Sequence, residues 1–379
     1  MFLPLLSLSV TLGCSGFNIL VYSPAFAGSH TNFMANLTDT LTEAGHNVTF
    51  LVPIVDEARK NQLGVKTTKD VVFVNLDHLA KRTIIPIDAN INDLWTMPIL
   101  SSNAWKMFRW FDKAIPLACD NFLRNREVFL AMKTKNFDVA IIEPVTVCGL
   151  GFAKALGIQK TIVVSSQSYY DFMLPYLGEA LEEAYKTIPI GGIVVKLEHS
   201  KLPLYWDHIL SLRTKSMLIS FGSLVGSSGM PVHWRQNILE VVRNEPNVTF
   251  IWKYENDDMA FAKGIGNLVF SKWVPQSALL NDARLTAFLT HGGLGSTNEL
   301  AYSGKPALVI PVFADQSRNG HMLARHHSAI ALQKTDLADF QLLQTAVHTI
   351  LNDPSYTKNA KKLAEMLKNQ PTNPKEVMI

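Results

Sequence analysis

One stretch, residues 273–316, concentrates the groups that could bind a charged ligand. Within it, the apolar run Leu285–Leu289 predicts a short buried strand, and the glycine-rich loop 290–293 follows. A helix is predicted over residues 295–302, because Gly304 is a typical stop signal. This order places the free N–H groups of a helix N-terminus at the carboxyl edge of a sheet, where they favour a phosphate or diphosphate.

Three kinds of group in this stretch suit a nucleotide. Gly292, Gly293 and Gly295 let a ligand approach the backbone closely. His291 adds a side-chain donor, and Glu299 is an acceptor that suits a pair of ribose hydroxyls. Taken alone, the glycines are more typical of a simple tight turn, so the interpretation depends on the whole stretch.

The order and spacing of further residues make the stretch specific. The motifs are W-x-P-Q at 273–276, T-H-x-G at 290–293, S-T-N-E at 296–299, G-x-P at 304–306 and P-x-x-x-D-Q at 311–316. Together they resemble the signature of the UDP-glycosyltransferase family, which includes the UDP-glucuronosyltransferases. The resemblance covers most of the chain and is strongest in its second half.

The resemblance implies a role in binding a UDP-sugar for each matched residue, and each role suits the chemistry of its side chain. The implied roles are stacking on uracil for Trp273, contact near the uridine for Gln276, the diphosphate for His291 and the groups at Gly293, Gly295 and Ser296, the ribose for Glu299, and the sugar hydroxyls for Asp315 and Gln316. One departure stands out. Many relatives have Asn at the position of Gly295, so Ser296 or backbone must replace a side-chain contact.

His30, in the sequence A-G-S-H, is a candidate base because an imidazole in a site loop can act near neutral pH. From the residues alone, a polar residue in a first helical turn is the simpler interpretation. The family has its catalytic His at this place and an orienting Asp after a strand that begins F-D-V. Here residues 137–139 begin that strand and Glu143 stands at the matching place. The resemblance therefore implies that Glu143 holds His30, with one methylene more than Asp.

Two residues of the second half are weaker candidates for donor binding. Ser223 follows the predicted strand Ser216–Phe221 and would approach the diphosphate, although a turn serine is an equal alternative. Lys253 stands where relatives often have a basic residue, although a solvated lysine at a strand end is equally consistent. We find no spacing of His, Cys and acids that predicts a metal site, and neither G-x-S-x-G nor a P-loop lysine motif.

Length and composition limit the class of protein. A chain of 379 residues, 47% hydrophobic and 18% charged, predicts a globular protein of two domains. The net charge of +3 is too small to favour nucleic acid or an anionic membrane as partner. Cys14 lies in the first apolar run. Cys119 and Cys148 are interpreted as buried thiols, with one disulfide bridge as the alternative.

The first 16 residues are a short apolar run ending in small residues, which predicts a cleaved secretory signal. We therefore expect a glycoprotein of the secretory pathway, in the endoplasmic reticulum lumen or secreted, with Asn36, Asn47 and Asn247 in candidate glycosylation sequons. We see no run of about 20 apolar residues, the length of a spanning helix. The C-terminal membrane anchor that relatives usually have is therefore expected to be absent from this chain.

Alternating strands and helices must position these groups. Strands are predicted at Phe17–Ser23, Asn47–Ile54, Val71–Leu76, Asp138–Ile142, Thr161–Ser165, Ser216–Phe221, Val248–Tyr254, Leu268–Ser271, Leu285–Leu289 and Ala307–Ile310. A helix is expected from His30 to Ala44 with Ser29 as its cap, and residues 93–133 are expected to be mostly helical. Two such runs of strands predict an α/β fold. The resemblance implies GT-B, two Rossmann-like lobes facing across a cleft.

The implied lobes are an N-terminal acceptor-binding lobe, residues 17–205, and a C-terminal UDP-sugar-binding lobe, residues 206–379. The family has a longer segment between residues 169 and 206, so the first lobe is expected to be shortened. Four aromatic residues of the first lobe suit an acceptor pocket, although core packing is the preferred alternative for each: Trp95, Trp105, Trp110 and Phe111. The tail 370–379 is expected to be frayed.

The implied reaction is inverting, metal-independent transfer of a hexosyl group, glucuronate or glucose, from a UDP-sugar to a small lipophilic hydroxyl or carboxyl acceptor, as in detoxification. The UDP-sugar is a co-substrate, and no cofactor is expected. A non-catalytic relative that binds a UDP-sugar or a partner is one alternative, and a sugar-nucleotide epimerase is another. A homo- or hetero-oligomer stays open. We expect the fragment from Ser216 onward to bind UDP by itself.

Overall fold

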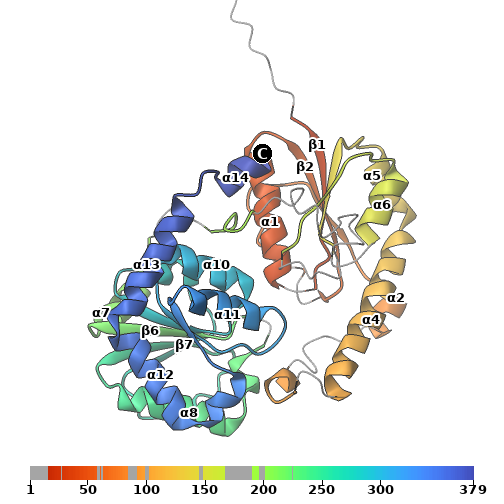
Figure 1. Ribbon diagram of the computed structural model, residues 1–379. Helices are drawn as coiled ribbons and strands as arrows, with labels where there is room; N and C mark the ends of the chain where they lie inside the picture. Colours follow the sequence, from red (N-terminus) through yellow and green to blue (C-terminus); the bar gives the residue numbers. More distant parts are fainter. Residues whose placement is uncertain are drawn as a thin grey trace, which may run out of the picture.

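The computed structural model describes residues 16–26, 28–57, 60, 63–83, 92–98, 102–144, 148–166, 190–195, 201–223 and 225–379. They form two lobes, each built on a parallel sheet (Figure 1). The predicted α/β class is confirmed. Because helices cover both faces of each sheet, the strands are nearly continuous apolar runs.

The first sheet has the strand order β3-β2-β1-β4-β5. Its strands are β1 (Asn18–Tyr22), β2 (Asn47–Pro53), β3 (Val71–Val74), β4 (Val139–Ile142) and β5 (Thr161–Val163). Its helical elements are α1 (Gly28–Glu43), α2 (His78–Thr83), η2 (Asn92–Trp95), α4 (Ser102–Leu123), α5 (Arg126–Lys133) and α6 (Cys148–Leu156). Helix α1 begins before Ser29, so the predicted cap was wrong and that residue lies inside the helix.

The second sheet has the strand order β11-β10-β9-β6-β7-β8. Its strands are β6 (Lys215–Ser220), β7 (Val248–Lys253), β8 (Leu268–Ser271), β9 (Leu285–Thr290), β10 (Ala307–Val309) and β11 (Ala329–Ala331). Its helical elements are α7 (Leu204–Ser211), η6 (Ser227–Gly229), α8 (Val232–Asn244), η7 (Ala260–Ala262), α9 (Gln276–Asn281), α10 (Leu294–Ser303), α11 (Gln316–Arg325), η8 (Lys334–Ala338), α12 (Phe340–Asn352), α13 (Pro354–Lys368) and α14 (Pro374–Met378).

A disulfide joins Cys119 of α4 to Cys148, the first residue of α6. The preferred expectation of two buried thiols was therefore wrong, and the bridge is present. Both helices cover the same face of the first sheet, where Phe122 packs on Phe152 at 4.5 Å between ring centroids. Parallel sheets bring such helices together although 29 residues separate the two cysteines.

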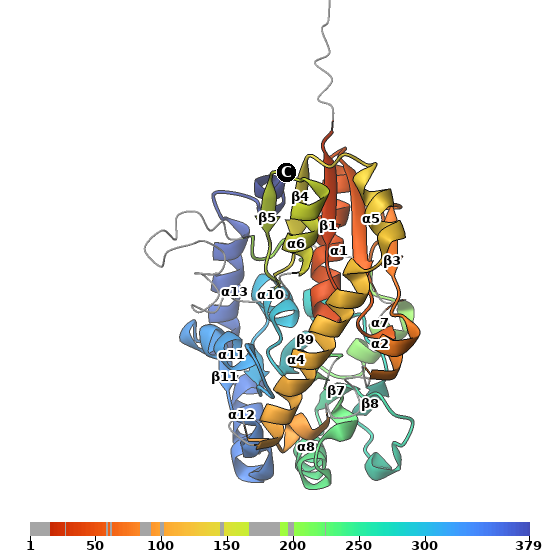
Figure 2. The same cartoon turned by 90° about the vertical axis from the view of Figure 1, so that its right-hand side faces the viewer.

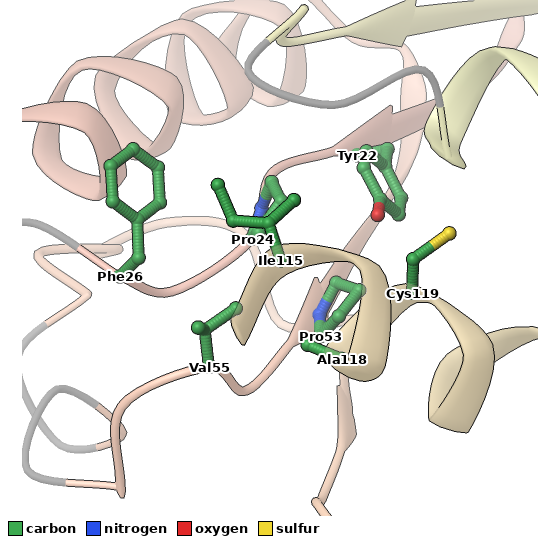
Figure 3. Close-up of a pocket in the computed structure, with 8 residues that line it drawn as sticks. All are labelled: Tyr22, Pro24, Phe26, Pro53, Val55, Ile115, Ala118 and Cys119. Carbon is green, nitrogen blue, oxygen red and sulfur yellow. The ribbon is translucent and has the colours of Figure 1, made fainter. Parts of the chain in front are cut away.

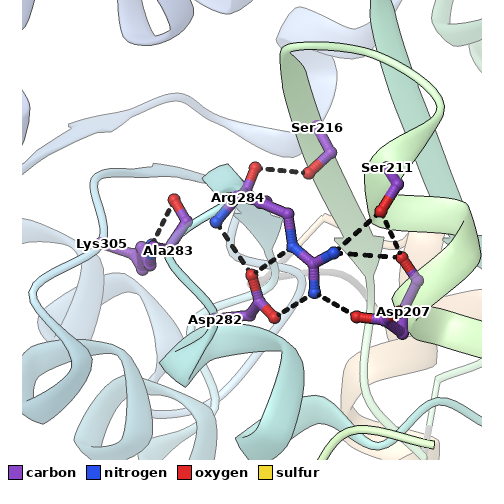
Figure 4. A network of polar contacts seen from close by, with 7 residues as sticks. All are labelled: Asp207, Ser211, Ser216, Asp282, Ala283, Arg284 and Lys305. Carbon is purple, nitrogen blue, oxygen red and sulfur yellow. Dashed lines mark hydrogen bonds and ion pairs between the residues drawn. The ribbon is translucent and has the colours of Figure 1, made fainter. Parts of the chain in front are cut away.

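Helix α7 belongs to the second lobe, because Trp206, Ile209 and Leu210 are buried in its core. The boundary at 205/206 therefore falls inside a helix that starts two residues earlier. Arg284 holds the outer side of α7, donating to Asp207 Oδ1 at 2.8 Å while it also binds Asp282 at 2.7 Å (Figure 4).

Each lobe receives a short piece of chain from the other. Leu94 and Trp95 lie in the core of the second lobe, although they precede most of the first lobe in sequence. Conversely, Met378 of α14 packs against the core of the first lobe, so the tail forms a helix where fraying was expected. Trp95 of η2 packs on Trp234 of α8. Figure 1 shows α14 beside α1, and in Figure 2 the marked C-terminus again lies beside the first lobe. The two lobes are therefore joined by more than the chain between them.

In the part of the chain that the structure describes, no helix combines the length and apolar character needed to cross a membrane.

Candidate functional site

His30 and Glu143 come together at the carboxyl edge of the first sheet. His30 lies in the first turn of α1, which follows β1, and Glu143 directly follows β4. Because β1 and β4 are neighbours, their carboxyl ends meet, and His30 Nδ1 lies 2.6 Å from Glu143 Oε1. The extra methylene of Glu therefore does not prevent the contact that the resemblance implied.

Two serines fix the Glu143 carboxylate, and neither was identified from the sequence. Ser23 Oγ donates to Oε2 at 2.8 Å, and Ser166 Oγ donates to Oε1. The Glu143 side chain is only 1% exposed, so these hydrogen bonds satisfy a buried charge. A signal was available, since Ser23 ends the predicted strand before α1 and Ser166 follows the predicted strand after α6.

This arrangement determines which nitrogen of His30 is available to a substrate. Nδ1 faces Glu143 Oε1 and also lies 2.6 Å from Ser166 Oγ, so a proton on Nδ1 is stabilised there. Nε2 then carries the lone pair, and it has no hydrogen-bond partner among the described residues. The imidazole is 16% exposed and packs on the Phe26 ring at 4.6 Å between centroids. Such a nitrogen can accept a proton from a bound hydroxyl.

An apolar pocket is lined by Phe26 (Figure 3), whose ring also packs on that of His30. Its lining comes from the carboxyl ends of β1 and β2 and from α4, and comprises Tyr22, Pro24, Phe26, Pro53, Val55, Ile115, Ala118 and Cys119. The aromatic residues predicted for an acceptor pocket are not among them. Trp95 instead packs in a hydrophobic core, as the preferred alternative stated. The side chains of Trp105, Trp110 and Phe111 lie outside the described residues.

Glu299 is held in place from outside its own helix. Gln276 Nε2 donates to its Oε2 at 2.6 Å, and Ser277 Oγ donates to its Oε1. Gln276 Nε2 also lies 3.0 Å from Ser296 Oγ. Helix α9 thus positions the acceptor group of α10. The structure gives Gln276 a supporting role in the site, and its predicted contact with uridine stays a prediction.

His291 is wedged between two glycines. An added Cβ would lie 2.7 Å from its imidazole at Gly222 and equally close at Gly293, so both positions exclude a side chain. Burial lowers the His291 pKa to about 4, and the charge of Lys253 acts in the same direction. The ring is therefore neutral at pH 7, and its Nδ1 is a buried atom without a hydrogen-bond partner among the described residues.

Lys253 is buried, which excludes the alternative of a solvated lysine at a strand end. Its Nζ donates to Gly222 O at 2.8 Å and lies 3.3 Å from Glu255 Oε1. It thereby supports the turn that carries Ser223, which is exposed. Lys253 thus lies beside the predicted diphosphate site. It affects that site indirectly, through its hydrogen bond to Gly222 and through the effect of its charge on the His291 pKa.

The N-terminus of α10 lies where the predicted diphosphate would bind. Gly293 is its N-cap in extended conformation and makes no side-chain cap, so the first N–H groups stay available to a ligand. Gly295 is exposed, and an added Cβ would meet nothing within 4 Å. The position that carries Asn in many relatives therefore has room for that side chain.

Asp315 and Gln316 begin α11 but differ in accessibility. Gln316 is buried, and its Oε1 accepts from the backbone N–H groups of Val312 at 2.8 Å and Phe313 at 3.0 Å. Only its amide Nε2 is left for a sugar hydroxyl. Asp315 is half-buried and its Oδ2 accepts from Asn319, which also binds Gly292 O and so joins the loop to the α10 turn.

Trp273 presents the flat surface that the sequence predicted. Its side chain is 73% exposed, although it is a large apolar group on a well-packed lobe. A ring left in solvent suits stacking on a base. Across residues 16–379, outside the gaps given above, no group of His, Cys, Asp and Glu side chains forms a metal site.

Comparison with known proteins gives one family. Residues 18–182 and 186–379 match the family described as UDP-glucoronosyl and UDP-glucosyl transferase. A Caenorhabditis briggsae protein whose name, ugt-47, places it among UDP-glucuronosyltransferases is 25% identical over 96% of this chain and 83% of its own length. That alignment has 456 positions, against 379 residues here, so the relative has segments without a counterpart in this chain. UDP-glucosyltransferase 2 of Dactylopius coccus is 30% identical over 51% of this chain and 36% of its own length.

Solved glycosyltransferases share the fold. The Phytolacca americana UGT2 structure, complexed with UDP-2fluoro-glucose and pterostilbene, has a TM-score of 0.66 at 15% identity and covers 96% of this chain and 98% of its own. The glycotransferase of kitacinnamycin has a TM-score of 0.64 at 17% identity and covers 96% and 97%. The predicted GT-B architecture is thus confirmed.

Proposed function

The chain belongs to the UDP-glucoronosyl and UDP-glucosyl transferase family, and on that premise we propose that it transfers a hexosyl group from a UDP-sugar to a small lipophilic acceptor. The acceptor would carry a hydroxyl or a carboxyl group. Support for an apolar acceptor comes from the apolar side chains of Phe26, Val55 and Ile115, of which Phe26 packs directly on His30.

In the proposed step, His30 Nε2 removes the acceptor proton while the acceptor oxygen attacks the anomeric carbon. The carbon–oxygen bond to the diphosphate breaks, and UDP leaves with the bonding electrons from the opposite face. One direct displacement inverts the anomeric centre. The buried Glu143 carboxylate stabilises the imidazolium that forms.

The departing diphosphate gains charge, and backbone donors can stabilise it. The uncapped N-terminus of α10 offers N–H groups with the favourable end of a helix dipole. Neutral His291 adds no charge of its own. We therefore propose metal-independent transfer, in which α10 supplies the stabilisation of the leaving group.

The main observation behind the proposal is the contact between His30 and Glu143. The decisive experiment therefore removes the imidazole of His30. His30→Ala should lower turnover on the order of 10² to 10⁴-fold, because a positioned base contributes about that much. UDP binding should persist, since Trp273, Glu299 and α10 lie in the other lobe. Turnover at the wild-type rate in His30→Ala would remove His30 from the mechanism.

The sugar is open between glucuronate and glucose. A glucuronate carboxylate favours a nearby cation, whereas glucose needs only hydroxyl partners, and Asp315 with the Gln316 amide suits both. Turnover with a panel of UDP-sugars would identify the donor. The same assay separates the alternatives, since a transferase forms a glycoside, an epimerase isomerises the sugar, and a binding protein does neither.

A non-catalytic UDP-sugar-binding relative remains the second candidate, and one observation favours it. The 456-position alignment is longer than this chain, and the family match is interrupted between residues 182 and 186, before the second lobe. An acceptor lobe that lacks segments of its relatives would retain the donor site. Tight UDP-sugar binding without glycoside formation would favour this candidate.

We also propose that the chain resides in the secretory pathway. The Cys119–Cys148 disulfide supports this placement, because such bonds persist in oxidising compartments. Asn47 and Asn247 are exposed and stand in sequons, whereas Asn36 is half-buried on α1. A mass decrease on endoglycosidase treatment, lost in Asn47→Gln and Asn247→Gln, would test this proposal.

A further inference from the structure

A segment of the first lobe, residues 93–97, enters the second lobe and is called the crossing segment here. Trp95 is fully buried there, in edge contact with Phe221 at 4.9 Å and with Trp234 at 6.4 Å between centroids. Its indole N–H donates to Gly226 O at 3.0 Å. The indole therefore reaches the loop between β6 and α8, which also carries Ser223.

Lys334 binds the crossing segment from the other side. Its Nζ donates to Leu94 O at 2.6 Å, to Met97 O at 2.8 Å and to Val312 O at 3.3 Å. These carbonyls can occupy all three N–H groups of the ammonium. Burial lowers the Lys334 pKa, which shows that its ammonium is withdrawn from water. One cation thus ties the crossing segment to the loop after β10.

The loop after β10 is the one that presents Asp315. The N–H of Val312 donates to Gln316 Oε1, while its carbonyl accepts from Lys334. A movement of Val312 would therefore be transmitted to Gln316 and to Asp315 beside it. Neither Lys334 nor Trp95 has a predicted contact with substrate, so both would act through these loops.

We propose that the crossing segment positions the sugar-binding loop, with Lys334 as the positioning residue for the sugar part of the donor. The inference rests on the proposed function, in which Asp315 and Gln316 bind sugar hydroxyls. UDP itself is proposed to contact α10 and Trp273, so its affinity should not depend on Lys334. The prediction is thus specific: sugar discrimination depends on a first-lobe segment buried in the second lobe.

The first test needs no ligand. Hydrogen exchange of the full chain should show faster exchange at residues 310–316 in Lys334→Met. The matched control is Lys215→Met, which removes an ammonium bound to Leu351 O at 3.0 Å and Asn352 Oδ1 at 2.6 Å in the same lobe. Unchanged exchange at residues 310–316 in Lys334→Met would overturn the inference.

The second test compares donor affinities by calorimetry with UDP, UDP-glucose and UDP-glucuronate. Lys334→Met should weaken binding of the preferred UDP-sugar about tenfold, as a misplaced positioning group does, while UDP affinity stays within about twofold. Lys334→Arg keeps a cation and should recover part of the loss. Trp95→Phe removes the indole N–H that donates to Gly226 O together with one ring of a buried side chain. Because that loop carries Ser223, this variant should weaken the binding of UDP and of the UDP-sugar alike.

The outcomes separate the two proposals. A wild-type chain that binds none of these UDP-sugars would refute the proposed function. Faster hydrogen exchange at residues 310–316 in Lys334→Met would still show that Lys334 holds the loop after β10. A wild-type chain that binds a UDP-sugar, with both Lys334 variants unaffected or with UDP and UDP-sugar weakened equally, would overturn the positioning role alone. Thermal unfolding of each variant checks that it is folded.

Discussion

At the scale of single residues, both the charge and the length of the Glu143 side chain matter. Its carboxylate reaches His30 at 2.6 Å, and two serines hold it in that orientation. Removing the charge in Glu143→Gln should lower turnover on the order of 10² to 10⁴-fold, because the imidazolium that forms loses its counter-charge. Steady-state kinetics with the preferred donor would measure the effect.

Glu143→Asp is the informative companion, because it keeps the charge and removes one methylene. The carboxylate then no longer reaches Nδ1 from the same backbone position. We expect a loss of about tenfold in turnover, smaller than in Glu143→Gln. Equal activity of Glu143→Asp and wild type would show that distance is not what this carboxylate contributes.

A side chain at position 295 is expected to increase the affinity for UDP. A side chain there meets open space beside the α10 N-terminus, so Gly295→Asn should add a donor to the diphosphate. One new hydrogen bond is worth about 1 kcal/mol, which is about fivefold in affinity for UDP. Gly151→Asn is the matched control, since Gly151 is also exposed on a helix with open space around it. Calorimetry showing no gain, or the same gain in both variants, would contradict this prediction.

The lowered pKa of His291 predicts that the free energy of unfolding depends on pH. Its folded-state pKa of about 4 lies below the unfolded value of 6.5, so the unfolded chain binds more protons between those values. Stability should therefore fall as pH falls from 6.5 to 4, by up to about 3 kcal/mol, and be unaffected by this group above that window. Urea unfolding at pH 7 and pH 4.5 would measure it. His291→Asn should flatten the dependence, whereas loss of the exposed imidazole in His321→Asn should leave it in place.

At the scale of elements, the disulfide joins two helices that cover the first sheet. It closes a loop spanning 29 residues, for which chain entropy gives about 3–4 kcal/mol of stabilisation. Cys119→Ala with Cys148→Ala should lower the stability of the first lobe by about that amount, with a smaller effect on UDP binding. Melting curves with and without reductant would measure it, and an identical curve for the double variant would argue against the bond.

Ten of the eleven strands in the described part of the chain and the donor stretch were predictable because each depends on local pattern, whereas the short edge strand β11 was not predicted. Helix α10 was expected at residues 295–302 and spans Leu294–Ser303, since its glycine stop and apolar flanks are adjacent in sequence. The crossing segment was not predictable, because a single 3-10 turn has no periodicity and its partners lie more than 100 residues away. The disulfide was only the alternative, because the sequence does not show that α4 and α6 lie side by side on one face of the sheet. Gln276 was assigned to the ligand because sequence cannot show that its amide already binds Glu299.

At the scale of the whole molecule, the exchange of core residues joins the two lobes. The fragment from Ser216 onward was expected to bind UDP, but it would lack Trp206, Ile209 and Leu210 as well as Trp95. We now expect it not to fold alone. For the intact chain we expect a single calorimetric unfolding transition, which Trp95→Ala should split or broaden. Two separate transitions in wild type would show that the lobes are independent.

The position of Trp95 also has a consequence for the order of events during synthesis. The ribosome delivers the first lobe before the second exists, and domains fold as they emerge. Leu94 and Trp95 must then remain without their native surroundings until more than 200 further residues, through Leu337 and the helix after it, have been made. A growing chain of this protein therefore carries an apolar segment that only the second half of the chain, from Phe221 onward, can cover, and we expect chaperones to bind this segment until then.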